Sequence, residues 1–114
     1  MTATVSLLHR EQFLQIAYTW SDKDEPQEGL LLVGAKQVVF TDTWHLANEL
    51  MLCDVTTTEH GISAYGTYKV EGYPEWGWRT VIEPVDATLR IAMYNVPPAG
   101  QGNEELGFEC VFKR

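Results

Sequence analysis

A carboxylate, an indole and an imidazole lie within four residues of one another at Asp42, Trp44 and His45. In an extended strand side chains alternate between two faces, so Asp42 and Trp44 share one face and His45 lies on the other. A carboxylate among apolar neighbours gains proton affinity unless a cation or hydrogen-bond donor compensates its charge, and Arg79 and Arg90 are the candidate partners. The segment predicts either a structural aspartate, linked to an arginine or to the backbone, or an acid, base or ligand-anchoring group.

His45 is one of three histidines in the chain. A neutral imidazole at a strand end can donate to a polar ligand group or shuttle a proton, and the plainer interpretation is an internally hydrogen-bonded histidine. His60, inside a predicted turn at residues 59–61, is expected to be solvated.

A second cluster contains two tryptophans, Trp76 and Trp78, which point to the same face of a predicted strand while Arg79 points to the other. Tryptophan combines a large contact area with one N–H donor. The pair is therefore either an aromatic wall for a flat or apolar ligand or part of the core, and both interpretations stay open.

These residues must be positioned by strands, because segments rich in Val, Ile, Thr and aromatic residues recur between short turn signals. About eight strands with brief connections predict an antiparallel meander, since the connections are too short for βαβ crossovers. Residues 6–15 and 43–52 also begin with helix-capping residue types and could instead contain a helical turn. The predicted strands cover 13–20, 29–34, 37–43, 49–57, 62–70 (with Val70 on the apolar face), 76–82, 88–93 and 105–113.

Each clear strand has one apolar face, which must be covered by closure into a barrel or by a second sheet. With no separate covering helix, a barrel is the simpler solution. At 114 residues the chain has the length of one domain. The prediction is an all-β fold, an antiparallel meander forming a small barrel or open half-barrel over residues 1–114.

The formal net charge of −8 argues against binding to nucleic acids or anionic membrane surfaces. No secretory signal is recognised at the N-terminus, and the longest apolar run, 30–33, is too short to cross a bilayer. Cys53 and Cys110 are therefore predicted to be buried thiols in a cytoplasmic protein rather than a disulfide. Close Cys or His pairs are lacking, so neither a metal site nor a cofactor is predicted.

Four short motifs in this order, Trp20 with 26–29, then 42–45, 76–79 and 93–95, resemble a family of short bacterial proteins of unknown function with calycin-like (lipocalin-like) barrels. The resemblance runs from residue 13 to the C-terminus and implies an antiparallel barrel without an established activity. The positions that match the family's motifs are Gln27, Asp42, Trp44, His45, Trp76, Trp78, Arg79, Tyr94 and Asn95.

Members of that family carry an additional N-terminal segment with a Trp-containing first strand. The barrel here is therefore expected to be open, or to be closed by a partner subunit. Open edge strands invite pairing with another chain, and a homodimer is the resulting hypothesis.

The leading prediction is a non-enzymatic module that binds a small, largely apolar ligand in the mouth of the barrel or in a groove. Its alternatives are a small enzyme, with Asp42 or His45 as acid or base and Arg79 stabilising negative charge, and a structural homo-oligomer without a ligand. The enzyme alternative requires a β-bulge that brings Asp42 and His45 to one face, because the alternation of side chains along a strand places them on opposite faces. The predicted ligand wall is Trp44, Trp76, Trp78 and Tyr94, and the orienting groups are Asp42, His45, Arg79 and Asn95.

Overall fold

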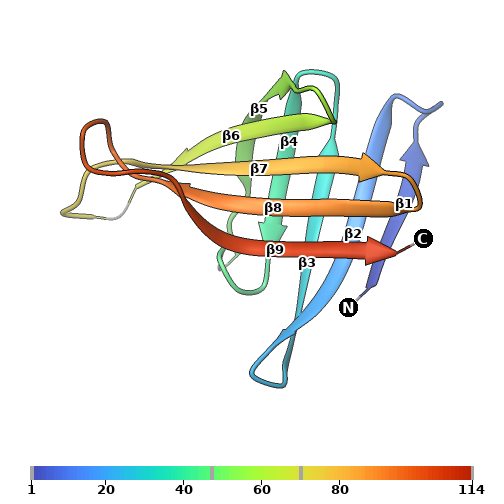
Figure 1. Cartoon of the computed structure of the whole chain (residues 1–114), viewed down its shortest axis with the longest axis horizontal. Helices are drawn as coiled ribbons and strands as arrows, with labels where there is room; N and C mark the ends of the chain where they lie inside the picture. The colour runs from blue at the N-terminus through green and yellow to red at the C-terminus, as the bar shows by residue number, and fades with distance from the viewer. Residues whose placement is uncertain (1, 47, 70, 114) are drawn as a thin grey trace. The chain divides into compact units, whose positions relative to one another are not determined.

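The structure, a computed structural model, describes residues 2–46, 48–69 and 71–113, and within these ranges it contains strands and no helix. Nine antiparallel strands form a meander in which the order in the sheet follows the order in the chain (Figure 1). The predicted fold class, an all-β antiparallel meander, is confirmed. The strands are β1 (Thr2–Leu8), β2 (Phe13–Asp22), β3 (Glu25–Val33), β4 (Gln37–Asp42), β5 (Met51–Thr57), β6 (Ile62–Tyr68), β7 (Trp76–Val85), β8 (Thr88–Val96) and β9 (Glu105–Lys113).

Both segments in which a helical turn was considered contain strands and turns instead. Residues 6–15 form the end of β1, a turn and the start of β2, and His9, Arg10 and Glu11 in that turn have φ values of 52°, 60° and 65°. Three consecutive residues with positive φ cannot continue a right-handed helix. Residues 43–52 form bends and then β5, with position 47 outside the described residues.

The β2–β3 hairpin is longer than predicted, because the turn contains only Lys23 and Asp24. Both have positive φ, 49° and 66°, as the two-residue turns that match strand twist require. Pro26 therefore lies inside β3, opposite Ser21. Its missing N–H is tolerated there because β4 pairs with β3 only from Gly29 onward.

The chain divides into two compact units, Met1–Cys53 and Asp54–Arg114, which are described separately. In the first unit Ile16, Leu31 and Phe40 face one another across β2, β3 and β4 and are fully buried. The hairpin of β2 and β3 extends past the ends of its neighbours, because β1 pairs with β2 only as far as Thr19 (Figure 1). This projecting end lies beside the end of β4.

In the second unit a row of buried side chains crosses β6 to β9 at Ala64, Thr80, Met93 and Phe108. On the opposite face, Arg90 of β8 forms ion pairs with both neighbouring strands, β7 and β9. The Arg90 guanidinium binds Glu83 at 2.7 Å and Glu109 at 2.8 Å. The predicted strand residue Val70 lies outside the described residues.

Cys53 and Cys110 are both buried thiols, as predicted, and neither forms a disulfide. Burial raises the pKa of the Cys110 thiol, so this group stays protonated at neutral pH.

A close approach between Tyr18 and Gly29 constrains the register of β2 and β3 beside the end of β4. The Tyr18 ring lies across Gly29, its partner on β3, and Gly29 is in turn paired with Asp42. A Cβ at Gly29 would come within 2.4 Å of the Tyr18 ring, and Tyr18 is only 1% exposed. Only glycine fits under this ring without displacing it.

Gly29→Ala is expected to lower the free energy of unfolding by about 1–3 kcal/mol, because the buried Tyr18 ring must move to admit a methyl group. Urea denaturation followed by circular dichroism measures the change. Gly107→Ala is the matched control, since a Cβ there meets its nearest neighbour at an ordinary 3.5 Å. Equal stability of the two variants would contradict this account.

Candidate functional site

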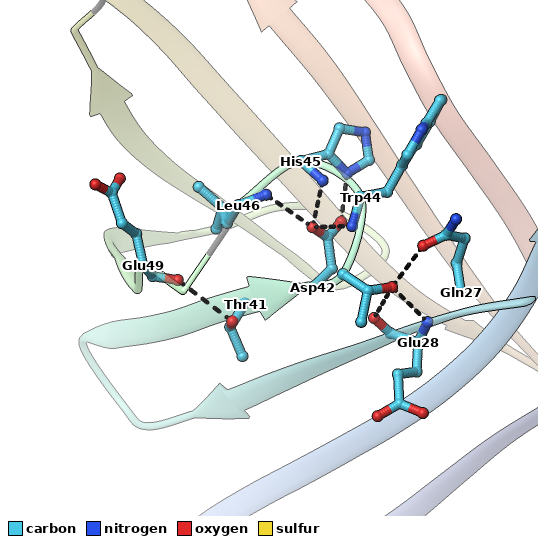
Figure 2. Close-up of polar contacts among 9 residues, drawn as sticks. Gln27, Glu28, Thr41, Asp42, Trp44, His45, Leu46 and Glu49 are labelled. Atoms are coloured by element: carbon cyan, nitrogen blue, oxygen red, sulfur yellow. Dashed lines mark hydrogen bonds and ion pairs between the residues drawn. The ribbon is translucent and has the colours of Figure 1, made fainter.

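Strand β4 ends at Asp42, and the Asp42 carboxylate organises the turn that follows (Figure 2). Oδ1 accepts the backbone N–H groups of Trp44 at 3.1 Å, His45 at 2.6 Å and Leu46 at 3.1 Å. Asp side chains cap helix N-termini in the same way, and here the pattern caps a single turn that no helix follows. We call residues 42–46 the Asp42 turn.

The second carboxylate oxygen of Asp42 meets His45 Nδ1. The Asp42 side chain is fully buried, whereas that of His45 is 20% exposed. The rings of Trp44 and Phe40 also contact the imidazole, at centroid distances of 4.7 Å and 6.3 Å. When Nδ1 of a neutral ring donates to the carboxylate, Nε2 becomes the acceptor nitrogen, which suits ligand binding or proton transfer.

These contacts correct two expectations. The predicted arginine partners of Asp42 are wrong, because the carboxylate uses His45 and the backbone. The guanidinium of Arg79 binds Glu104 instead, and that of Arg90 binds Glu83 and Glu109. The expected separation of Asp42 and His45 on opposite faces is also wrong, since the strand ends at Asp42 and alternation stops there.

Burial alone would raise the pKa of Asp42, because it penalises the charged form. The hydrogen bond and charge of His45 and the backbone N–H groups of His45 and Leu46 outweigh this effect. The pKa of Asp42 therefore lies below its ordinary value, and the carboxylate is ionised at neutral pH.

A groove of about 360 Å³ adjoins the Asp42 turn at the projecting end of the β2–β3 hairpin. Its main apolar surface is Trp20, whose ring stacks on the buried Tyr18 ring at 5.6 Å with an interplanar angle of 23°. We call it the hairpin groove. It is lined by Thr19, Trp20, Ser21, Pro26, Gln27, Glu28 and Thr43.

Thr43 joins the hairpin groove to the Asp42 turn. Its backbone N–H donates to the Glu28 carbonyl at 2.9 Å, and its hydroxyl accepts the Glu28 N–H at 3.0 Å. The same hydroxyl donates to Gln27 Oε1 at 2.6 Å, which leaves the amide N–H₂ of Gln27 as the donor end of that side chain. Figure 2 shows Gln27 and Trp44 on the same side of the turn.

The remaining predicted site residues belong to the second unit and lie on two opposite faces. Trp78 is the cross-strand partner of Asn95, and the Asn95 Oδ1 atom accepts the Tyr68 hydroxyl at 2.7 Å. Trp76 is the cross-strand partner of Tyr68, so Trp76, Trp78 and Asn95 share one face. Tyr94 and Arg79 pair with each other on the other face.

Arg79 does not join the predicted aromatic wall. Its guanidinium binds Glu104 at 2.8 Å, contacts the Ser63 hydroxyl at 3.2 Å and lies 5.4 Å from the centre of the Tyr65 ring. Tyr94 contacts Arg90 at 3.2 Å on that same face. Within this unit, the predicted set is therefore split by the period-two alternation of β7 and β8.

Trp20, Gln27 and Thr43 were not among the predicted site residues. Trp20 and Gln27 belong to the first of the four motifs, and that motif was the sequence signal that could have pointed to them. Pairing across the hairpin brings the two residues opposite each other, which the linear sequence did not show because a longer turn was expected there.

In the described ranges, no three His, Cys, Asp or Glu side chains gather closely enough to hold a metal ion. The same ranges contain no helical segment with the length and apolar character needed to cross a membrane. Comparisons with protein-family models, with curated proteins and with solved structures return no match to this chain.

Asp42→Asn is expected to lower the free energy of unfolding at pH 7 by about 1–3 kcal/mol, because a charge-assisted network is replaced by a neutral amide. The folded-state pKa of Asp42 is depressed, so its stabilisation is complete above the unfolded-state value near pH 4. It is lost as the pH falls through the lower folded-state pKa.

Urea denaturation at a series of pH values between about 7 and 2 tests this expectation. The difference between the wild type and Asp42→Asn should shrink as the solution is acidified. Asp54→Asn, at an exposed strand position, is the control and should change stability little at any pH. A difference that stays constant down to the lowest pH would show that the charge of Asp42 does not stabilise the fold.

Proposed function

We propose that this protein binds a small molecule in the hairpin groove, beside the Asp42 turn. One observation carries the proposal: a groove with a tryptophan surface is bounded by polar groups that are already held by hydrogen bonds. Sites of this kind combine an apolar surface with a few fixed polar groups, and a volume of about 360 Å³ falls within their usual range.

The chemistry of the lining favours a ligand with a flat apolar face and a hydrogen-bonding edge. Trp20 offers the face, while the Gln27 amide N–H₂, held in place by the Thr43 hydroxyl, offers the edge. Five of the seven lining residues are polar types, so a ligand in this groove would carry hydrogen-bonding groups beside its apolar face. Glu28 and the net charge of −8 disfavour an anion, so the ligand is neutral or cationic.

Asp42 has a positioning role in this proposal, because its fully buried carboxylate is engaged by three backbone N–H groups and His45. Thr43 is the member of the turn that lines the groove, and Trp44, at 49% exposure, and the partly exposed His45 are further members that can contact a ligand. Acid–base chemistry at His45 is the second candidate. The contact between Asp42 and His45 Nδ1 favours this chemistry. The contacts with Asp42, Trp44 and Phe40 orient the imidazole ring, and none of these residues is a reacting group.

Three finer expectations accompany the proposal. The resemblance to the calycin-like family implies an antiparallel barrel, open or closed by a partner, and small barrels of this kind can hold one small ligand. The two buried thiols support a cytoplasmic location. Trp76, Trp78 and Asn95 on their shared face remain a second candidate wall, with Arg79 and Tyr94 excluded from it.

The proposal is tested by NMR with a panel of neutral and cationic aromatic fragments and neutral monosaccharides. We expect at least one compound to shift the Trp20 indole N–H resonance together with backbone amides of the Asp42 turn. Gln27→Ala should weaken binding of that compound about five- to tenfold, because one hydrogen bond to the ligand is lost.

Gln101→Ala removes the same side chain from an exposed turn and should leave the affinity unchanged. The proposal is overturned if no compound shifts these resonances at about 1 mM, a weak-binding limit. It is also overturned if the bound compounds shift only the indole resonances of Trp76 and Trp78.

A further inference from the structure

Strand β1 stands at one end of the strand order and, within the described residues, pairs only with β2. In an antiparallel ladder alternate residues direct their N–H and C=O groups toward each neighbour. About half of the β1 backbone groups therefore point away from β2. Such an edge is a template for another strand unless something blocks it.

The sequence of β1 contains none of the devices that block an edge. The seven residues Thr2–Leu8 include no charged residue, no proline and no glycine, and each of the other eight strands contains at least one of these. Val5 and Leu7 lie on the same face as the buried Ile16, yet they are 51% and 60% exposed. An apolar surface is therefore uncovered along this edge.

Strand β9, at the other end of the order, differs in its charge. It carries Glu105, Glu109 and Lys113, with Glu104 directly before it. Two β9 strands paired antiparallel about Glu109 would place two carboxylates opposite each other at the centre, with each Glu105 opposite Lys113 of the other copy. A β9 pair thus has a like-charged pair at its centre, whereas a β1 pair brings no charged side chains of the two strands together.

We propose that β1 pairs with β1 of a second copy of this chain, antiparallel and about a two-fold axis near Val5. This partner needs no sequence other than the chain's own, and a strand that pairs with its own copy closes the assembly at two members. The Val5 side chains then meet at the centre, and each Leu7 lies opposite Ala3 of the other copy. One face of the new pair is apolar, and the other carries hydroxyls from Thr2, Thr4 and Ser6.

Two seven-residue strands offer less area than the roughly 1,200 Å² of a stable interface. The dimer is therefore weak and reversible. We expect half-association at a chain concentration between about 10 µM and 1 mM, the range of weak complexes.

Sedimentation velocity across that range tests the proposal. The average mass should rise from 12.9 kDa toward twice that value in the wild type. Val5→Lys should remain monomeric throughout, because it places two like charges opposite each other at the centre of the pair. Val111→Lys is the matched control, since it makes the same charge change at a 47% exposed valine of β9, and it should dimerise like the wild type.

Amide hydrogen exchange of the wild type supplies a second readout that needs no variant. The outward-facing β1 amides should exchange more slowly as the concentration rises. The proposal is overturned by a monomer mass at every concentration, by dimerisation that persists in a folded Val5→Lys variant, or by loss of dimerisation in Val111→Lys. Protection of β1 that is the same at low and high concentration also overturns it, because the edge is then covered within one chain.

Discussion

Side chains on an antiparallel ladder alternate between two faces, and every strand of this meander pairs with its neighbour in the chain. A shift of one residue in any hairpin would therefore exchange the faces of the strand that follows. This constraint aligns Tyr18, Gly29 and Asp42 in one row and sets Trp78 and Arg79 on opposite faces. The ring of Tyr18 over Gly29 helps to keep that register, since no other residue type fits there.

The Asp42 turn begins where this alternation stops. A buried carboxylate would be costly alone, but its oxygens accept three backbone N–H groups and meet His45, so its charge is retained. The same bonds fix the conformation of the residues that follow β4. Thr43 joins this turn to the hairpin end, and both border the hairpin groove.

Charge is distributed unevenly over the strands: β1 has no charged residue, whereas β9 has three. The ion pairs of Arg90 with Glu83 and Glu109 link β7, β8 and β9, the last three strands in the order. Partly exposed ion pairs of this kind add little to stability. Strand β1 carries no charged residue, and its Val5 and Leu7 side chains are exposed.

The sequence by itself determined the all-β class, most strand positions and the two buried thiols, because period-two hydrophobicity and turn residues are local signals. It also singled out Asp42 and His45. It missed the length of the β2–β3 hairpin, because a two-residue turn at Lys23 and Asp24 leaves a weak local signal. It also missed β1, whose last residues belong to the segment 6–15 in which a helical turn was considered. Only the tertiary structure decided that Asp42 binds His45 rather than an arginine and that Gln27 lies beside Thr43. Those pairings depend on where a strand ends and which hairpin lies next to it, and neither is set by the spacing of residues along the chain.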